Sequence, residues 1–387
     1  MTRARGSAEG VGRAERRTAG TPYLSLVDGV RGVAALAVLL YHYVHFFMTG
    51  PDYRRVPGYL ELYPAHDVLQ PFYRYGFCAV QVFWLISGFV FAHVYYGHRG
   101  GTRSFFANRL ARLYPLHLLT LLVVAALQLA ALYRLGYTPI YRNFDWQDFG
   151  LQLFMAGDWQ RRGMSFNGPF WSVSVEIVIY TAFWLSRGVV ARLGLPLLVA
   201  MVAGCHFADA SWGGATRIFS CGFYFFSGSA LCLLWRSSWG AGWRLAWLAL
   251  ALAAAGAGAI AQWGWWGWSV FGIIGLFGAL FLGLATVELR APAWLRRACE
   301  WLGENTYGVY LWHFPIQLTI ILVLLPGIAP QTVAQNGWFL ALFVALVVTV
   351  ARVSFVYIER PMRDVLRRHL ASGRHHAKRG DKPAAVR

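Results

Sequence analysis

Residues 28–48 read DGVRGVAALAVLLYHYVHFFM. About 20 mostly apolar residues is the length that an α-helix needs to cross a bilayer. Arg31 and His42 are costly in hydrocarbon, and they are close to three helical turns apart, so they face the same side about 16 Å apart along the axis. We interpret them as a cation for an anionic group and a base that acts deeper in the membrane. Alternatively, Arg31 reaches the lipid headgroups and His42 bonds to a neighbouring helix.

The composition is typical of a polytopic membrane protein. Of the 387 residues, 57% are hydrophobic and 13% are charged, and the mean hydropathy is +0.45. The net charge of +18 does not indicate a nucleic-acid partner, because the basic residues form short clusters between apolar spans. The five cysteines lack a metal-ligand spacing, so we expect no metal and interpret them as packing residues.

Ten apolar spans follow one another along the chain. We therefore predict an all-α membrane protein, a bundle of about ten transmembrane helices, with Pro361 ending the last one. The approximate spans are 28–48, 76–96, 110–132, 170–186, 193–207, 218–235, 243–262, 266–287, 307–325 and 338–357.

The basic residues predict the orientation of this bundle. If the N-terminus is cytoplasmic and the chain crosses ten times, most of the 35 Lys and Arg residues fall in cytoplasmic segments, and the bias alternates from loop to loop. We expect a basic cytoplasmic arm at 1–23, a transmembrane domain at 24–359 and a basic cytoplasmic tail at 360–387. The arm lacks the apolar core of a cleavable signal, so the first helix is expected to be an uncleaved anchor.

Polar residues interrupt several later spans. Arg109 and Arg112 lie three apart at the predicted cytoplasmic end of the third helix, where a guanidinium pair suits phosphate; anionic headgroups are the alternative ligand. Ser87–Gly88 forms a small notch that admits another helix or a thin substrate arm. The helix of Glu176 is predicted to start on the outer side of the membrane, and His42 is predicted to lie toward the same side. We therefore expect the Glu176 carboxylate to orient the His42 imidazole.

Six motifs occur in order, and together they resemble the acyltransferase-3 family of bacterial membrane O-acyltransferases. The resemblance implies ten helices in the bacterial cytoplasmic membrane. It also implies that the acyl donor is cytoplasmic acyl-CoA, with acetyl-CoA as the expected form, and that the acceptor is a hydroxyl of a glycan, lipid-linked sugar or secondary metabolite. Gln81 departs from the family pattern, which commonly has an acid there. The motifs are Arg31 with His42, FWLISGF at 83–89, RLARLYP at 109–115, WSVSVE at 171–176, GENTYGVYLWHFP at 303–315 and IERP at 358–361.

The motifs and the resemblance lead to a mechanistic hypothesis. The three arginines named above hold the CoA phosphates, and the pantetheine arm passes Ser87 toward His42. His42, helped by Glu176, acts as general base on the acceptor hydroxyl, in direct attack on the thioester or through an acyl-histidine. Three further residues are expected to line the substrate site: Trp171, Ser174 and His313.

Two other classes of function stay open at this point. A transporter or flippase could use Arg31, His42, Glu176 and His313 as a proton relay. A non-catalytic scaffold in an envelope-glycan complex would tolerate replacement of His42. The cytoplasmic arginine pair and the ordered motifs favour the enzyme.

Overall fold

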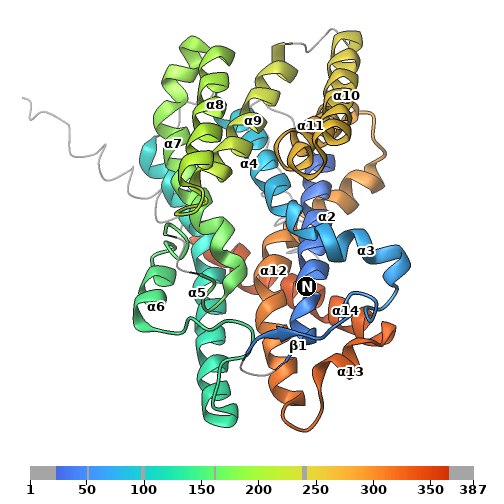
Figure 1. Cartoon of the computed structure of the whole chain (residues 1–387). Coiled ribbons are helices and arrows are strands. Elements are labelled where there is room, and N and C mark those ends of the chain that lie inside the picture. The colour runs from blue at the N-terminus through green and yellow to red at the C-terminus, as the bar shows by residue number, and fades with distance from the viewer. Residues whose placement is uncertain (1–22, 50–51, 97–100, 161–162, 238–241, 366–387) are drawn as a thin grey trace, which may run out of the picture.

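A computed structural model describes residues 23–49, 52–96, 101–160, 163–237 and 242–365 of the chain (Figure 1). The predicted terminal arm, apart from residue 23, and the tail beyond residue 365 lie outside the described residues. The described chain is almost wholly helical. Its one two-stranded ladder pairs β1 (Met48–Thr49) antiparallel with β2 (Arg54–Arg55).

The long helices follow the predicted spans, and the all-α membrane architecture is confirmed. They are α2 (Ser25–Tyr41), α4 (Ala79–Tyr95), α5 (Thr102–Leu135), α7 (Trp171–Leu193), α8 (Leu195–Trp212), α9 (Ile218–Ser237), α10 (Gly242–Gly267), α11 (Ile273–Val287), α12 (Ala293–Leu324) and α14 (Gly337–Ser354). Among the described residues, nine helices are long and apolar enough to cross a membrane, and the shorter apolar helix α11 occupies the remaining predicted span.

Short segments complete the fold. Three are α-helices outside the long set: α3 (His66–Tyr75), α6 (Trp146–Leu153) and α13 (Pro330–Ala334). Three are 3₁₀ turns: η1 (His42–Phe47), η2 (Gly76–Cys78) and η3 (Gly168–Phe170). Two are π turns: η4 (Trp268–Gly272) and η5 (Phe355–Glu359).

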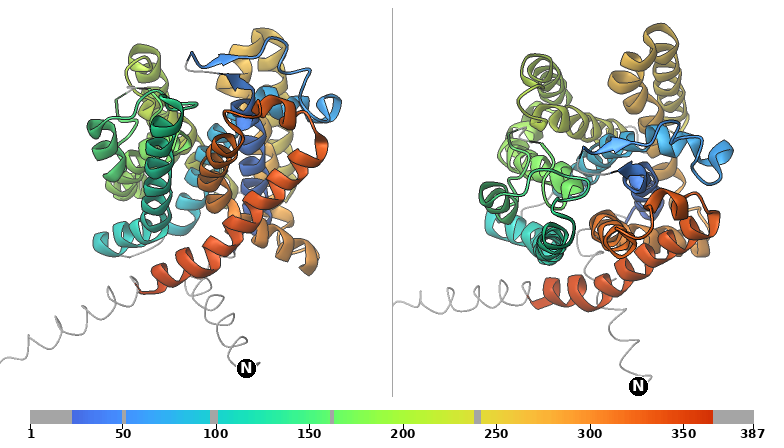
Figure 2. Two further views of the ribbon diagram at one scale, coloured as in Figure 1. Left: turned by 90° about the horizontal axis from the view of Figure 1, so that it is seen from below. Right: turned by 60° about the horizontal axis from the view of Figure 1, so that its bottom comes forward.

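Helices α2 and α12 pack closely along each other at the middle of the bundle (Figure 2). A Cβ added at Gly32 would lie 2.6 Å from the Cβ of Leu302, so only glycine allows this approach. The first turn of α2 is held from another helix, because Glu288 accepts a hydrogen bond from the Leu26 N–H at 2.9 Å. The helix that carries Arg31 and leads directly into His42 is therefore held at the centre of the molecule.

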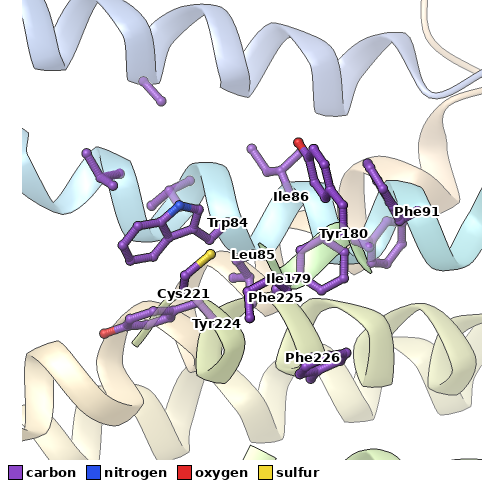
Figure 3. Close-up of a cluster of buried hydrophobic side chains, with 14 of the residues drawn as sticks. Trp84, Leu85, Ile86, Phe91, Ile179, Tyr180, Cys221, Tyr224, Phe225 and Phe226 are labelled. Carbon is purple, nitrogen blue, oxygen red and sulfur yellow. The ribbon is translucent and has the colours of Figure 1, made fainter. Parts of the chain in front are cut away.

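Helices α4 and α9 cross at Gly88, the predicted notch. A Cβ at Gly88 would overlap the carbonyl oxygen of Phe225, and the Ser229 hydroxyl donates to the Gly88 carbonyl at 3.1 Å. The space at Gly88 is thus filled by the backbone of α9 and is not open to a substrate arm. The aromatic cluster beside this crossing joins α4, α7 and α9 (Figure 3), and within it the Phe91 and Tyr180 rings stack with centroids 4.4 Å apart.

Pro361 does not end the last helix, contrary to the prediction. The helix continues through Pro361 to Val365. The π turn η5 lies directly before the proline, and the Arg360 N–H bonds to the Phe355 carbonyl, five residues back. A π turn widens the helix by one residue, which relieves the clash between a proline ring and the preceding turn.

Candidate active site

A cavity of about 120 Å³ lies inside the bundle, between α2, α4, α5, α7 and α12. Five residues predicted for the active site line it: Arg31, Ser87, Arg109, Arg112 and Glu176. We call this the central cavity. The structure thus brings the four predicted donor-binding residues together with Glu176, although the five come from four different helices.

The central cavity has an arginine end and a closed end. Arg109 bonds to the Tyr95 hydroxyl at 2.9 Å, and Trp84 donates to the Ser172 carbonyl at 3.3 Å. Trp84 and Tyr95 are both on α4, 11 residues apart, so the ends are about 16 Å apart along that helix.

Three guanidinium groups gather at the arginine end of the central cavity. Arg31 pairs with Asp28, with 3.0 Å between Nη1 and Oδ1, and Arg109 lies over the Phe91 ring, 4.6 Å from its centroid. Arg112 lies in the electrostatic range of both other arginines, and within the described ranges it makes no ion pair. Three guanidinium groups around one cavity suit a ligand that carries several phosphate oxygens.

Glu176 occupies the α7 wall of the central cavity. Its carboxylate lies beside the hydroxyl groups of Ser87 and Tyr180, and its side chain is 8% exposed. Among the described residues, Oε1 has no hydrogen-bond partner. A buried carboxylate oxygen left unpaired is costly unless a ligand supplies the donor.

Tyr310 and Ser172 close the other end. The Tyr310 hydroxyl is 2.6 Å from both the Pro169 carbonyl oxygen and the Ser172 Oγ. A carbonyl only accepts, so Tyr310 gives its one proton to Pro169, and Ser172 donates to Tyr310. We call Tyr310 and Ser172 together the Tyr310 wall. On the side of this wall away from the cavity, the Tyr310 ring lies 6.1 Å from the ring of His313, centroid to centroid.

His42 lies on the far side of this wall, in a cluster of three imidazoles, His42, His45 and His313. The ring centroid of His42 is 5.1 Å from that of His45 and 5.0 Å from that of His313. His42 and His45 are neighbours because the α-helix changes at His42 to the 3₁₀ turn η1, in which residues three apart eclipse each other. The three do not form a metal-binding group among the described residues.

Backbone and side-chain carbonyls fix the tautomers of this histidine cluster. The Nδ1 of His42 is 3.0 Å from the Val38 carbonyl oxygen, and the Nδ1 of His313 is 3.3 Å from that of Val309. The Gln317 amide nitrogen donates to the His42 carbonyl at 2.9 Å, so the Gln317 oxygen accepts from His45 Nδ1 at 3.0 Å. Each neutral ring therefore carries its proton on Nδ1 and a lone pair on Nε2.

The expected pairing of Glu176 with His42 is not present. Glu176 lies in the central cavity, and the hydrogen bonds and ring contacts of the His42 side chain are to Val38, Tyr41, His45 and His313. The two residues approach the bundle centre from opposite sides of the Tyr310 wall. The sequence placed both at mid-membrane depth but could not show this wall.

Trp171 and Ser174, predicted to bind substrate, hold the segment around Asp158, Ser174 directly and Trp171 through Arg217. Ser174 is fully buried; its Oγ accepts from the Asp158 N–H at 3.0 Å and its carbonyl accepts from Trp159 at 2.9 Å. The Arg217 guanidinium lies 4.5 Å above the Trp171 ring and pairs with Asp158 at 2.7 Å. Neither Trp171 nor Ser174 lines the central cavity.

Several residues of the site were missed from the sequence. His45 follows His42 by three residues, and Gln317 follows His313 by four, so helical spacing alone could have suggested both as partners. Tyr141 also borders the cluster, with its ring centroid 5.7 Å from that of His45. Burial raises the pKa of the Tyr141 phenol, which keeps it protonated.

Comparison with known proteins identifies the family of the chain. The model of the acyltransferase-3 family, an acyltransferase domain, matches residues 25–357. The chain belongs to the acyltransferase-3 family. It therefore carries an acyltransferase domain in a multi-pass integral membrane protein.

Three relatives illustrate the range of similarity. The chain is 33% identical to "Protein 2 in picA locus" of Rhizobium radiobacter over 47% of this chain and 95% of that protein. It is 28% identical to acyltransferase MdmB of Streptomyces mycarofaciens over 42% of each chain, and 23% identical to the peptidoglycan O-acetyltransferase OatA of Listeria monocytogenes over 88% of this chain and 56% of OatA. No solved structure matches the chain.

Proposed function

We propose that the protein moves an acyl group, acetyl in the first instance, from acyl-CoA to a hydroxyl of a glycan, lipid-linked sugar or small-molecule acceptor. The observation that carries this proposal is the central cavity, with three arginines at one end and a closed end about 16 Å away. That length is of the order of the pantetheine arm. The phosphates would lie at Arg31, Arg109 and Arg112, and the thioester would lie near Ser172.

His42 is the proposed general base. Its Nε2 lone pair takes the proton of the acceptor hydroxyl while the hydroxyl oxygen attacks the thioester carbon. A new C–O bond forms, the C–S bond breaks, and CoA leaves as the thiolate, which then takes up one proton. The same lone pair could instead attack the thioester first, giving an acyl-histidine that the acceptor hydroxyl then resolves.

The transfer step requires the Tyr310 wall to admit the thioester or the acceptor. Tyr310 lines the central cavity, and its ring contacts His313, which in turn contacts His42. The route from donor to base therefore passes the side chains of Tyr310 and His313. We infer that donor and acceptor enter from opposite sides of the membrane and meet there.

The hydrogen bonds of the histidine cluster argue against the proton relay of a transporter. A relay through an imidazole takes a proton at one nitrogen and releases it at the other. Here each Nδ1 proton is held by a carbonyl oxygen of Val38, Val309 or Gln317. Protons can enter and leave only at Nε2, as suits a base.

We further propose that both termini are cytoplasmic and that the arginine end of the central cavity faces the cytoplasm. The start of α5, which carries Arg109 and Arg112, lies in the basic segment that the charge bias assigns to the inside. This orientation gives the arginines access to cytoplasmic acyl-CoA in the bacterial cytoplasmic membrane.

The test is CoA release from acetyl-CoA by the purified full chain in nanodiscs, followed chromatographically with candidate glycan acceptors. His42→Gln should bind CoA normally but turn over about 100-fold to 10,000-fold more slowly, the usual contribution of a general base. His206→Gln is the matched control, since His206 contacts Phe223 outside both groups of site residues. Near-normal turnover by His42→Gln would end the general-base assignment.

A further inference from the structure

Glu176 has the surroundings of a ligand-binding residue. It is nine-tenths buried, it lines the central cavity, and its Oε1 has no hydrogen-bond partner among the described residues. The hydroxyl groups beside it, on Ser87 and Tyr180, come from two different helices and hold the carboxylate in place. A hydrogen-bond donor for Oε1 must therefore come from a ligand in the cavity.

The position of Glu176 along the central cavity limits which part of a ligand can supply this hydrogen-bond donor. Ser87 follows Trp84 by one turn of α4 and precedes Tyr95 by about two turns. Glu176 contacts Ser87 and Tyr180, so it lies between the closed end and the arginine end. A donor molecule with its phosphates at the arginines and its thioester at Ser172 would place its connecting arm beside Glu176.

The chemistry of that arm fits a carboxylate. The pantetheine arm contains two amide groups, and each amide N–H is a hydrogen-bond donor without charge. Most of the remaining wall is apolar, formed by side chains such as Phe83, Val90 and Val173. In such surroundings a hydrogen bond from an amide to a charged acceptor is among the stronger polar contacts.

We infer that Glu176 accepts a hydrogen bond from an amide N–H of the pantetheine arm and is a donor-binding residue, separate from the base at His42. This inference rests on the proposed function, because it presumes acyl-CoA in the central cavity. It differs from a charge-balancing role, in which Glu176 would only offset the nearby Arg31 and Arg112.

Two ligands separate these roles by the sign of the effect. Binding of CoA and of adenosine 3′-phosphate 5′-diphosphate, which keeps the phosphates but lacks the arm, is measured by calorimetry on the full chain in nanodiscs. With Glu176→Gln, the affinity for CoA should fall roughly three- to tenfold, because a neutral amide oxygen is a weaker acceptor. The affinity for the armless ligand should stay the same or rise, because an anion near the arginines has been removed.

Two further variants complete the experiment. Glu176→Asp keeps the charge but withdraws the carboxylate by one methylene, so it should lower the affinity for CoA and leave the affinity for the armless ligand unchanged. It replaces the glutamine variant if that variant does not fold. Glu304→Gln removes an equal charge from the pair with Arg352, away from the central cavity, and should leave both affinities unchanged. Equal changes for both ligands in the Glu176 variants would overturn the inference but keep the proposed function. Failure of the unmodified chain to bind CoA would end both.

Discussion

At the scale of single residues, the site separates two tasks between two groups of side chains. Arginines and Glu176 line the central cavity, and the histidine cluster lies behind Tyr310. Each imidazole has one nitrogen held by a carbonyl group, so only Nε2 is available for chemistry. The geometry of His42 is thus determined by backbone and amide contacts, and no carboxylate of the described residues is its partner.

Arg112 provides the sharpest test of phosphate binding, because the structure gives it no ion pair within the described part of the chain. Arg112→Gln should raise the KM for acetyl-CoA about tenfold or more with little change in kcat, as expected when a charge-assisted contact to the ground state is lost. Arg112→Lys should recover only part of this loss, since lysine cannot bind in a bidentate manner.

The control for this prediction is Arg236→Gln, which removes an exposed arginine from the last turn of α9. Steady-state kinetics on purified protein provide the measurement. A fall in kcat at unchanged KM in Arg112→Gln would assign Arg112 to the chemical step and would contradict the phosphate role.

At the scale of elements, sequence patterns predicted the helices but not their local departures. Hydrophobic length predicted the span of α2, yet the change to 3₁₀ at His42 depends on contacts with Gln317 of α12. Likewise, Pro361 alone predicts a helix end, and only the π turn before it allows the helix to continue. Such departures depend on tertiary contacts that no local pattern carries.

The crossing of α4 and α9 makes a prediction about stability. Gly88→Val should lower the apparent melting temperature in detergent and reduce the yield of folded protein, because the side chain would overlap the α9 backbone. Overpacking of this kind costs about 1 to 3 kcal/mol or more. Gly188→Ala is the control, since nothing lies within 4 Å of a Cβ there. Equal melting temperatures for Gly88→Val and the unmodified chain would mean that the crossing is looser than described.

At the scale of the whole molecule, the bundle surrounds a cavity whose lining comes from helices far apart in sequence. The sequence predicted that two residues line the cavity together where their spacing puts them on one face of a helix, as with Arg109 and Arg112. It did not show that Glu176 and His42 are separated by Tyr310, because the side that Glu176 occupies depends on how α7 packs against α4. It also failed for Ser174, whose hydroxyl is used by the backbone of Asp158.

Orientation in the membrane can be tested by cysteine labelling. In a background with all five native cysteines replaced, Arg103→Cys and Gln160→Cys should react with a membrane-impermeant maleimide from opposite sides of sealed vesicles. The expectation follows from the alternating charge bias, which places the start of α5 inside and the 155–167 loop outside. Both sites should react once detergent opens the vesicles. Labelling from the same side would contradict the proposed orientation and the cytoplasmic donor.

The proline within α12 has a mechanical consequence. Pro315 cannot donate to the carbonyl of Leu311, four residues earlier, and the Asn167 amide fills that position at 3.2 Å. A proline usually loosens the helix that contains it, but here the freed carbonyl fastens a second part of the chain to the helix. The turn between Tyr310 and His313 therefore gains stiffness from Asn167, and a displacement of Asn167 would be transmitted directly to the barrier between donor and base.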